Sequence, residues 1–166
     1  MSMIEFFKQN CKDITDEKEV KDVITKILKK EAFDHKGLIY GMGHAVYTKS
    51  DPRAILLKEK AATLAEIKGC NEEFELYSLI EKLTPDIFYE MKGDSKQISA
   101  NVDLYSGFVY KMLGISPDLY TPMFAVSRIV GWCAHRIEEV TTCNRIIRPG
   151  YKSIYKEKKY VPLAER

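Results

Sequence analysis

The sequence predicts an all-α fold, and two observations lead to this prediction. Apolar residues recur at helical spacing along most of the 166 residues. Capping residues precede several of these runs and glycines follow them, which marks helix starts and ends. The balance of 45% hydrophobic and 30% charged residues is typical of a globular chain. The length suits one domain, or one domain and part of a second.

The first predicted helix begins after Asp16, which forms a capping pair with Glu19 three residues later. The helix is expected to end before Gly37, because glycine readily adopts the left-handed conformation that stops a helix. The short apolar segment 38–40 is bounded by glycines, so we expect a brief strand or an extended link there. The predicted buried face of the helix consists of Val20, Val23, Ile24, Ile27 and Leu28.

Asp51 and Pro52 mark the start of a second helix, since aspartate is a good N-cap and proline suits the first helical position. This helix should end at Gly69. A third helix follows, with Pro85 starting or bending a continuation to Met91. The apolar positions of these two helices are Leu57, Ala61, Leu64 and Ala65, then Phe74, Leu76, Leu79, Ile80 and Leu83.

Two more helices complete the expected fold. One runs from about Val102 to near Gly114, and the other begins with Thr121 as a cap before Pro122. The apolar positions of the last helix keep the helical spacing, at Val126, Val130, Cys133, Ile137 and Val140.

Composition excludes several classes of function. A formal net charge of +2 gives no reason to expect a nucleic-acid partner. No stretch is apolar enough to span a bilayer, and the first residues lack the pattern of a signal peptide. The four cysteines and three histidines are scattered, so we expect neither a metal site nor a disulfide framework. Reduced thiols indicate a cytoplasmic protein.

The segment 41–53 contains polar residues that an amphipathic helix does not need. Gly41 and Gly43 permit positive φ angles and close approach of a ligand, and His44 follows them directly. Arg53 lies in the first turn of the second predicted helix, where free N–H groups and a guanidinium together suit a carboxylate. The alternative is a glycine turn with a core histidine and a surface arginine.

Three further residues are candidates with equally plain alternatives. Asp103 lies at the start of an apolar helix, where it is either a cap or, if it faces an apolar cleft, a base of raised pKa. Arg128 lies inside the last apolar helix and is either a ligand or a side chain that extends to solvent. Arg148 is either a ligand or a loop charge.

Taken together, four segments resemble the citrate synthase family. Segment 41–53, with its glycine-rich turn, histidine and Asp-Pro-Arg, is similar to the family's signature. Segment 101–107 resembles the second active-site segment, and 124–132 followed by Arg148-Pro149 resembles the third. Their order and separations match the family. The resemblance extends from about Asp16 to Tyr155 and implies a citrate-synthase-like helical fold.

The resemblance also implies a reaction, the condensation of acetyl-CoA with oxaloacetate to citrate and CoA in the tricarboxylic acid cycle. Asp103 would be the base that deprotonates acetyl-CoA, and His44 would polarise the oxaloacetate carbonyl. Arg53 and Arg128 would bind carboxylates, and Arg148 would reach the neighbouring subunit's site. The family forms dimers, so a homodimer is expected. Acetyl-CoA is a substrate, and no resident cofactor is implied.

The resemblance divides the chain into a small mobile domain, residues 1–114, and a C-terminal segment of the large domain, residues 115–166. The family's upstream histidine has no counterpart here, since the surroundings of His35 do not match. Thr48 precedes Lys49 where family members often have basic residues, so no CoA-phosphate ligand is assigned. The chain by itself is therefore expected to be inactive.

Three alternatives remain open. One is a 2-methylcitrate synthase, which uses propionyl-CoA with the same core motifs, because a pocket for one extra methylene is not readable from the sequence. Another is a non-enzymatic domain that binds carboxylates or CoA. The last is an unrelated helical interaction module.

Overall fold

The computed structural model describes residues 2–93, 97–142, 159 and 161–165, and their secondary structure is helical. Met42 and Ala100 form an isolated antiparallel bridge, and these described residues contain no longer strand. The all-α prediction is confirmed. The chain divides into two compact units, Met1–Pro122 and Met123–Arg166.

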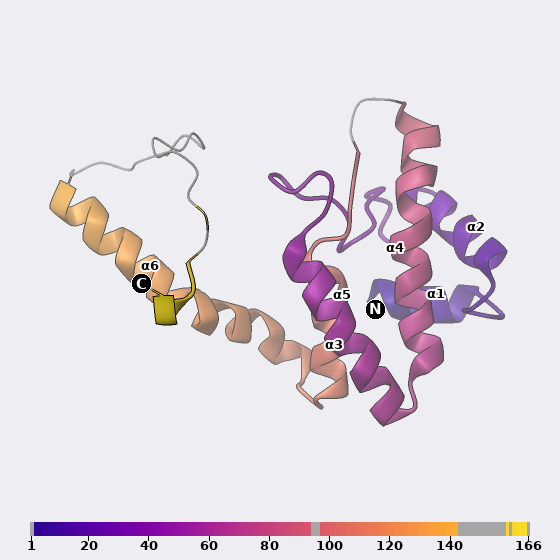
Figure 1. Cartoon of the computed structure of the whole chain (residues 1–166). Helices are drawn as coiled ribbons and strands as arrows, with labels where there is room; N and C mark the ends of the chain where they lie inside the picture. The colour runs from indigo at the N-terminus through magenta and orange to yellow at the C-terminus, as the bar shows by residue number, and fades with distance from the viewer. Residues whose placement is uncertain (1, 94–96, 143–158, 160, 166) are drawn as a thin grey trace. The chain divides into compact units, whose positions relative to one another are not determined.

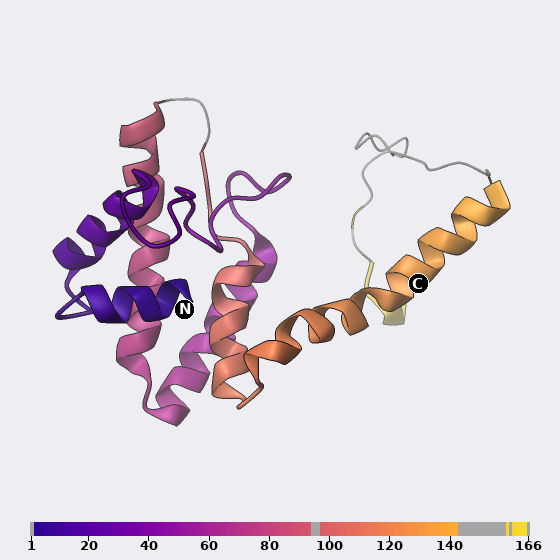
Figure 2. The ribbon, with the colours of Figure 1, turned by 180° about the vertical axis from the view of Figure 1, so that it is seen from behind.

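The first unit is built from helices that pack on one another around a single core. Helix α3 lies along α5, and α4 packs on both α2 and α3 (Figure 1). Figure 2 shows α1 crossing α4 on the side away from α3. The elements of this unit are α1 (Met3–Asn10), α2 (Glu17–Leu28), α3 (Pro52–Lys68), α4 (Asn71–Lys92), α5 (Val102–Met112) and the short 3-10 helix η1 (Pro117–Leu119).

The ends of α3 follow the local sequence signals. The Asp51 side chain accepts a hydrogen bond from the Arg53 N–H, and Pro52 takes the first helical position. Gly69 ends the helix with a φ of 65°, a conformation that glycine adopts without steric cost. Both predicted boundaries are confirmed.

The start of α2 agrees with the prediction only in part. Asp16 caps the helix by accepting from the Lys18 N–H at 2.9 Å. The carboxylate of Glu19, however, accepts from the N–H groups of Lys12 and Asp13, so it ties the preceding loop to the helix instead of reaching back to Asp16. The helix ends at Leu28, well before Gly37, and residues 38–40 form a link that turns at Tyr40 rather than a strand.

Two helices contain a proline near a predicted boundary. Helix α4 continues through Pro85, so this proline does not start a new helix. The hydroxyl of Thr84 donates to the Ile80 carbonyl at 2.6 Å within this turn. Helix α6 (Tyr120–Thr142) begins before Thr121, directly after η1, so Thr121 lies inside the first turn and does not cap it.

Helix α1 was not expected from the sequence, yet it contributes to the core. Eight residues are too few to show a clear helical period, and a helix of this length depends on tertiary packing for its stability. Three of its residues are buried, and Phe7 is completely so. The most fully buried apolar side chains of the unit are Phe7, Val20, Ile24, Ile27, Ala61, Ala65, Leu76, Ile80, Tyr105 and Phe108.

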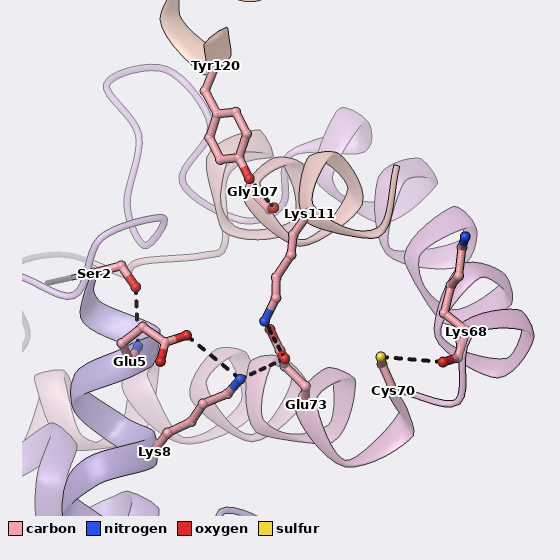
Figure 3. A network of polar contacts seen from close by, with 9 residues as sticks. All are labelled: Ser2, Glu5, Lys8, Lys68, Cys70, Glu73, Gly107, Lys111 and Tyr120. Atoms are coloured by element: carbon pink, nitrogen blue, oxygen red, sulfur yellow. Dashed lines mark hydrogen bonds and ion pairs between the residues drawn. The ribbon is translucent and has the colours of Figure 1, made fainter. Parts of the chain in front are cut away.

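A buried carboxylate links three helices of this unit. Glu73 on α4 is 9% exposed and accepts from Lys8 of α1 at 2.7 Å and from Lys111 of α5 at 2.8 and 2.7 Å (Figure 3). Burial tends to raise the pKa of Glu73, but the two ammonium groups outweigh burial and lower it. The ion pairs therefore stabilise the packing of α1 and α5 on α4.

The first unit extends past residue 114 to Pro122 because Tyr120 packs on α5. Its ring centroid lies 5.0 Å from that of Tyr110, and its hydroxyl donates to the Gly107 carbonyl at 3.5 Å (Figure 3). Burial raises the pKa of the Tyr120 hydroxyl, which keeps it protonated as a donor.

The second unit contains most of α6 and the 3-10 helix η2 (Leu163–Glu165). None of the described residues of α6 is buried. Its exposed large apolar side chains are Met123, Phe124, Val126, Ile129, Val130, Trp132, Ile137 and Val140. Every helix in the described part of the chain is too short or too polar to cross a membrane.

Candidate active site

Two segments that are distant in sequence pair at the start of α5. The Gly43 N–H donates to the Ser99 carbonyl at 2.7 Å, and the Asn101 N–H donates to the Gly41 carbonyl at 2.9 Å. Gly41 has a φ of +88°, and a Cβ at this position would lie 2.7 Å from the Leu104 Cα. Only glycine permits this close approach. The pairing brings the segment with His44 to the helix that begins beside Asp103.

His44 is held by the backbone that follows it. Its Nδ1 accepts hydrogen bonds from the N–H groups of Val46 at 3.0 Å and Tyr47 at 3.1 Å. Because a backbone N–H can only donate, Nδ1 is unprotonated, and the neutral imidazole has its proton on Nε2. The ring is half-buried and lies 4.9 Å from the Tyr47 ring. This arrangement leaves Nε2–H as a donor suited to a ligand carbonyl.

Arg53 is oriented by a buried carboxylate. Asp51 is 1% exposed and accepts from Arg53 Nε at 3.0 Å and from a terminal guanidinium nitrogen at 2.8 Å. The guanidinium also lies 5.3 Å from the centroid of the Tyr47 ring, within the range of a cation–π contact. Asp51 takes two of the five N–H donors of the guanidinium, so another edge can still bind a carboxylate.

The electrostatics of this pair follow from its hydrogen bonds. The Arg53 side chain, and then the backbone N–H groups of Arg53 and Val102, lower the pKa of Asp51 against the opposing effect of burial. Asp51 in turn raises the pKa of Arg53, and the charge of Asp103 contributes in the same direction. Both groups of the pair are therefore charged at neutral pH, and Asp103 lies within electrostatic reach of the guanidinium.

Asp103 occupies the first turn of α5, where its N–H donates to the Asn101 side chain at 2.9 Å. Its own side chain is exposed, so the apolar cleft considered for it does not enclose it within the described chain. Asp103 is one of the residues that line a pocket of about 740 Å³, together with Leu104, Gly107, Tyr77 and Tyr120.

The five predicted site residues thus fall into three groups. The first unit contains His44, Arg53 and Asp103: the paired segments link the backbone beside His44 to the start of α5, and Asp51 holds Arg53 within electrostatic reach of Asp103. Arg128 belongs to the second unit, where it is exposed and its guanidinium lies 5.1 Å from the Phe124 ring centroid. Arg148 lies outside the described residues.

Two residues of this site were given no such role from the sequence. Asp51 was expected only as a helix cap, although its position two residues before Arg53 is a signal that it could also hold the guanidinium. Asn101 was included in the second segment without a role, and it donates from its amide to the Gly43 carbonyl at 2.7 Å. No local pattern could indicate that contact, because its partner is distant in sequence.

Comparison with known proteins decides the family. The family described as "Citrate synthase, C-terminal domain" matches residues 2–150. The chain belongs to the citrate synthase family. It is 41% identical over 133 residues to citrate synthase of Synechocystis sp., covering 80% of this chain and 32% of that protein. It is 33% identical over 155 residues to 2-methylcitrate synthase of Shewanella oneidensis, covering 93% and 38% respectively.

Solved citrate synthases have the same fold. The ternary complex of citrate synthase from Thermoplasma acidophilum with carboxymethyl coenzyme A and oxaloacetate matches 98% of this chain and 40% of its own, with a TM-score of 0.62 and 33% identity. Citrate synthase from Pyrobaculum aerophilum matches 100% of this chain and 39% of its own, with a TM-score of 0.66 and 30% identity. The chain thus spans about a third of the length of the curated citrate synthases that it matches.

Proposed function

We propose that this chain provides the oxaloacetate-binding part of a citrate synthase active site and one of its catalytic carboxylates. The observation on which this rests is the pairing of segments 41–43 and 99–101, which brings the backbone next to His44 to the start of α5, where Asp103 lies within electrostatic reach of Arg53. A related citrate synthase, from Thermoplasma acidophilum, binds oxaloacetate and carboxymethyl coenzyme A in a ternary complex. The family and the local geometry therefore support the same ligand class.

The residues have distinct roles in this proposal. His44 donates from Nε2 to the ketone oxygen of oxaloacetate, which makes the ketone carbon electrophilic. Arg53 binds a carboxylate of oxaloacetate with the edge that faces away from Asp51. Asp103 removes the proton next to the thioester carbonyl of acetyl-CoA. Arg128 and Arg148 are proposed as further carboxylate ligands, the latter for the neighbouring subunit.

Condensation needs a second donor that stabilises the enol oxygen of acetyl-CoA. The family uses an upstream histidine for this, and the sequence around His35 does not match that motif. We therefore expect the chain by itself to bind oxaloacetate without turning it over. Residues 1–114 would correspond to the small mobile domain, and residues 115–166 to part of the large domain.

The test measures oxaloacetate binding and turnover separately. Titration calorimetry on the whole chain is expected to show binding that Arg53→Gln weakens about 10- to 150-fold, which corresponds to one charge-assisted hydrogen bond. His44→Ala removes a hydrogen bond between neutral groups and should weaken binding about 2- to 12-fold. Asp103→Asn should leave this binding intact, and Arg136→Gln, which removes an exposed guanidinium of α6, is the matched control. Absence of oxaloacetate binding, or equal effects of the Arg53 and Arg136 variants, would contradict the proposal.

A coupled assay for free CoA measures turnover. Turnover above background with acetyl-CoA and oxaloacetate would show that the chain is active alone and would refute its expected inactivity. The 33% identity to a 2-methylcitrate synthase over 93% of the chain makes propionyl-CoA the second thioester to compare. Binding of oxaloacetate or CoA that stays without turnover even when the chain is joined to the first two thirds of a related citrate synthase would favour a non-enzymatic binding domain.

The exposed apolar side chains of α6 support a homodimer. Large exposed apolar surface usually marks an interaction site, and eight large apolar side chains of this helix are exposed, including Trp132 at 55% and Val130 at 77%. Sedimentation at increasing concentration is expected to show self-association, and a monomer at high concentration would contradict it. The cytoplasmic location stays a prediction.

A further inference from the structure

The Asn101 side chain connects the two candidate catalytic residues of the first unit. Its Nδ2 donates to the Gly43 carbonyl at 2.7 Å, and its Oδ1 accepts from the Asp103 N–H at 2.9 Å. Gly43 directly precedes His44, so one planar amide joins the peptide that leads into His44 to the backbone of Asp103. The amide is half-buried, which limits competition from water.

We propose that Asn101 is a positioning residue, which fixes the His44 imidazole relative to the Asp103 carboxylate. The proposal rests on the function proposed above, since it assigns a purpose to holding these two groups together. Condensation requires the ketone of oxaloacetate and the base to keep one geometry, and small displacements of reacting groups cost large factors in rate.

The chemistry of the amide separates this role from helix capping. A cap needs only an acceptor for the Asp103 N–H, and aspartate or serine provides it as well as asparagine does. The bond to the Gly43 carbonyl needs a donor at the same time, which an ionised aspartate lacks and a serine hydroxyl is too short to supply in the same position. Among these residues, only asparagine serves both contacts.

The backbone around Asn101 keeps the two segments paired when its side chain is changed. The bonds from the Gly43 N–H to Ser99 and from the Asn101 N–H to Gly41 do not involve the amide. Variants at position 101 are therefore expected to fold. What changes is the orientation of the peptide between Gly43 and His44, whose carbonyl loses its donor and, in an aspartate variant, faces a negative charge.

The experiment compares Asn101→Asp and Asn101→Ser in the whole chain. Both keep the cap and lose the donor, but only aspartate adds a charge. The matched control is Asn10→Asp, because the Asn10 amide donates to a backbone carbonyl, that of Phe6, at 2.8 Å on α1 and has no part in the site. The measurements are the imidazole ¹⁵N resonances of His44 without ligand and the Kd for oxaloacetate.

Both Asn101 variants are expected to shift the His44 resonances toward a mixture of tautomers and to weaken oxaloacetate binding about 2- to 12-fold, the effect of one hydrogen bond. Asn10→Asp should change neither quantity. Unchanged His44 resonances in both variants would overturn the proposal. So would a change in Asn101→Asp but not in Asn101→Ser, because such a change would come from the added charge and not from the lost donor. If the unchanged chain does not bind oxaloacetate, the proposed function fails, while the ligand-free spectra still decide the role of Asn101.

Discussion

Replacing Asp51 by alanine tests how segment 41–53 is anchored to the helices. Asp51 caps α3 through the Arg53 N–H, binds the Arg53 guanidinium with both oxygens, and receives the Val102 N–H at the start of α5. The carboxylate is buried, whereas the Arg53 side chain is 38% exposed. Alanine removes all these contacts at once and introduces no steric conflict.

The expected loss can be estimated from each contact. A lost N-cap costs about 1 kcal/mol. The ion pair adds about 1 kcal/mol at most, because solvent screens the half-exposed guanidinium. An unpaired Val102 N–H adds about 1 kcal/mol, the low end for a buried donor that loses its partner. The free energy of unfolding should therefore fall by about 2–3 kcal/mol.

Urea unfolding followed by circular dichroism measures this loss, and Asp16→Ala is the matched control. Asp16 is also an aspartate cap, of α2, and accepts from Lys18. Its replacement should therefore cost only about 1 kcal/mol. Equal losses for the two variants would refute the claim that Asp51 anchors a second segment.

The same contact predicts a dependence on pH. Because the folded-state pKa of Asp51 is lower than its ordinary value of 3.8, its stabilisation is complete at neutral pH and is lost as the pH falls through the folded-state value. The difference in stability between the unchanged chain and Asp51→Ala should accordingly be constant near neutral pH and narrow below about pH 4. A difference that stays constant down to about pH 2.5 would show that the charge of Asp51 does not contribute.

Three further predictions concern the fold and the exposed helix. Gly41→Ala should lower the free energy of unfolding by more than about 2 kcal/mol, because the added Cβ would lie 2.7 Å from the α5 backbone. Gly43→Ala, whose Cβ would lie 3.9 Å from its nearest neighbour, should lower it by about 1 kcal/mol. Equal losses in urea unfolding would contradict the close approach at Gly41. Glu73→Gln should lower the free energy of unfolding by about 1–3 kcal/mol at neutral pH, and the difference should narrow as the pH falls below the ordinary pKa of 4.5 and through the lowered folded-state pKa of Glu73. Glu72→Gln, at an exposed neighbouring position, should leave the stability unchanged. Val130→Glu should shift the sedimentation equilibrium toward monomer, and unchanged association would place the interface elsewhere.

Much of the fold could be predicted because its signals are local. The cap at Asp51, the proline after it and the stop at Gly69 act within one or two turns of α3, so their effect does not depend on the rest of the chain. The buried face of α2 likewise follows from helical spacing alone. The predicted capping pair of Asp16 and Glu19 did not form in full, because the Glu19 carboxylate accepts hydrogen bonds from the preceding loop instead.

The candidate site shows the same division. The residue types of His44, Arg53 and Asp103 left both a carboxylate site and plainer structural roles open, and four ordered segments indicated the family. The link between the backbone beside His44 and the start of α5 depends on the pairing of segments 41–43 and 99–101, whose hydrogen bonds join residues that are distant in sequence. No local pattern contains such a bond, and the sequence therefore left the capping role of Asp103 open.

The sequence by itself determined the helical class, most helix boundaries and the residue types of the site, because backbone hydrogen bonding and side-chain period act over a few neighbouring residues. Only the tertiary structure decided that α1 belongs to the core, that Glu73 is buried between two lysines, and that Asn101 joins Gly43 to Asp103. Each of these depends on a contact between distant parts of the chain, whose free energy is gained only after the helices have packed.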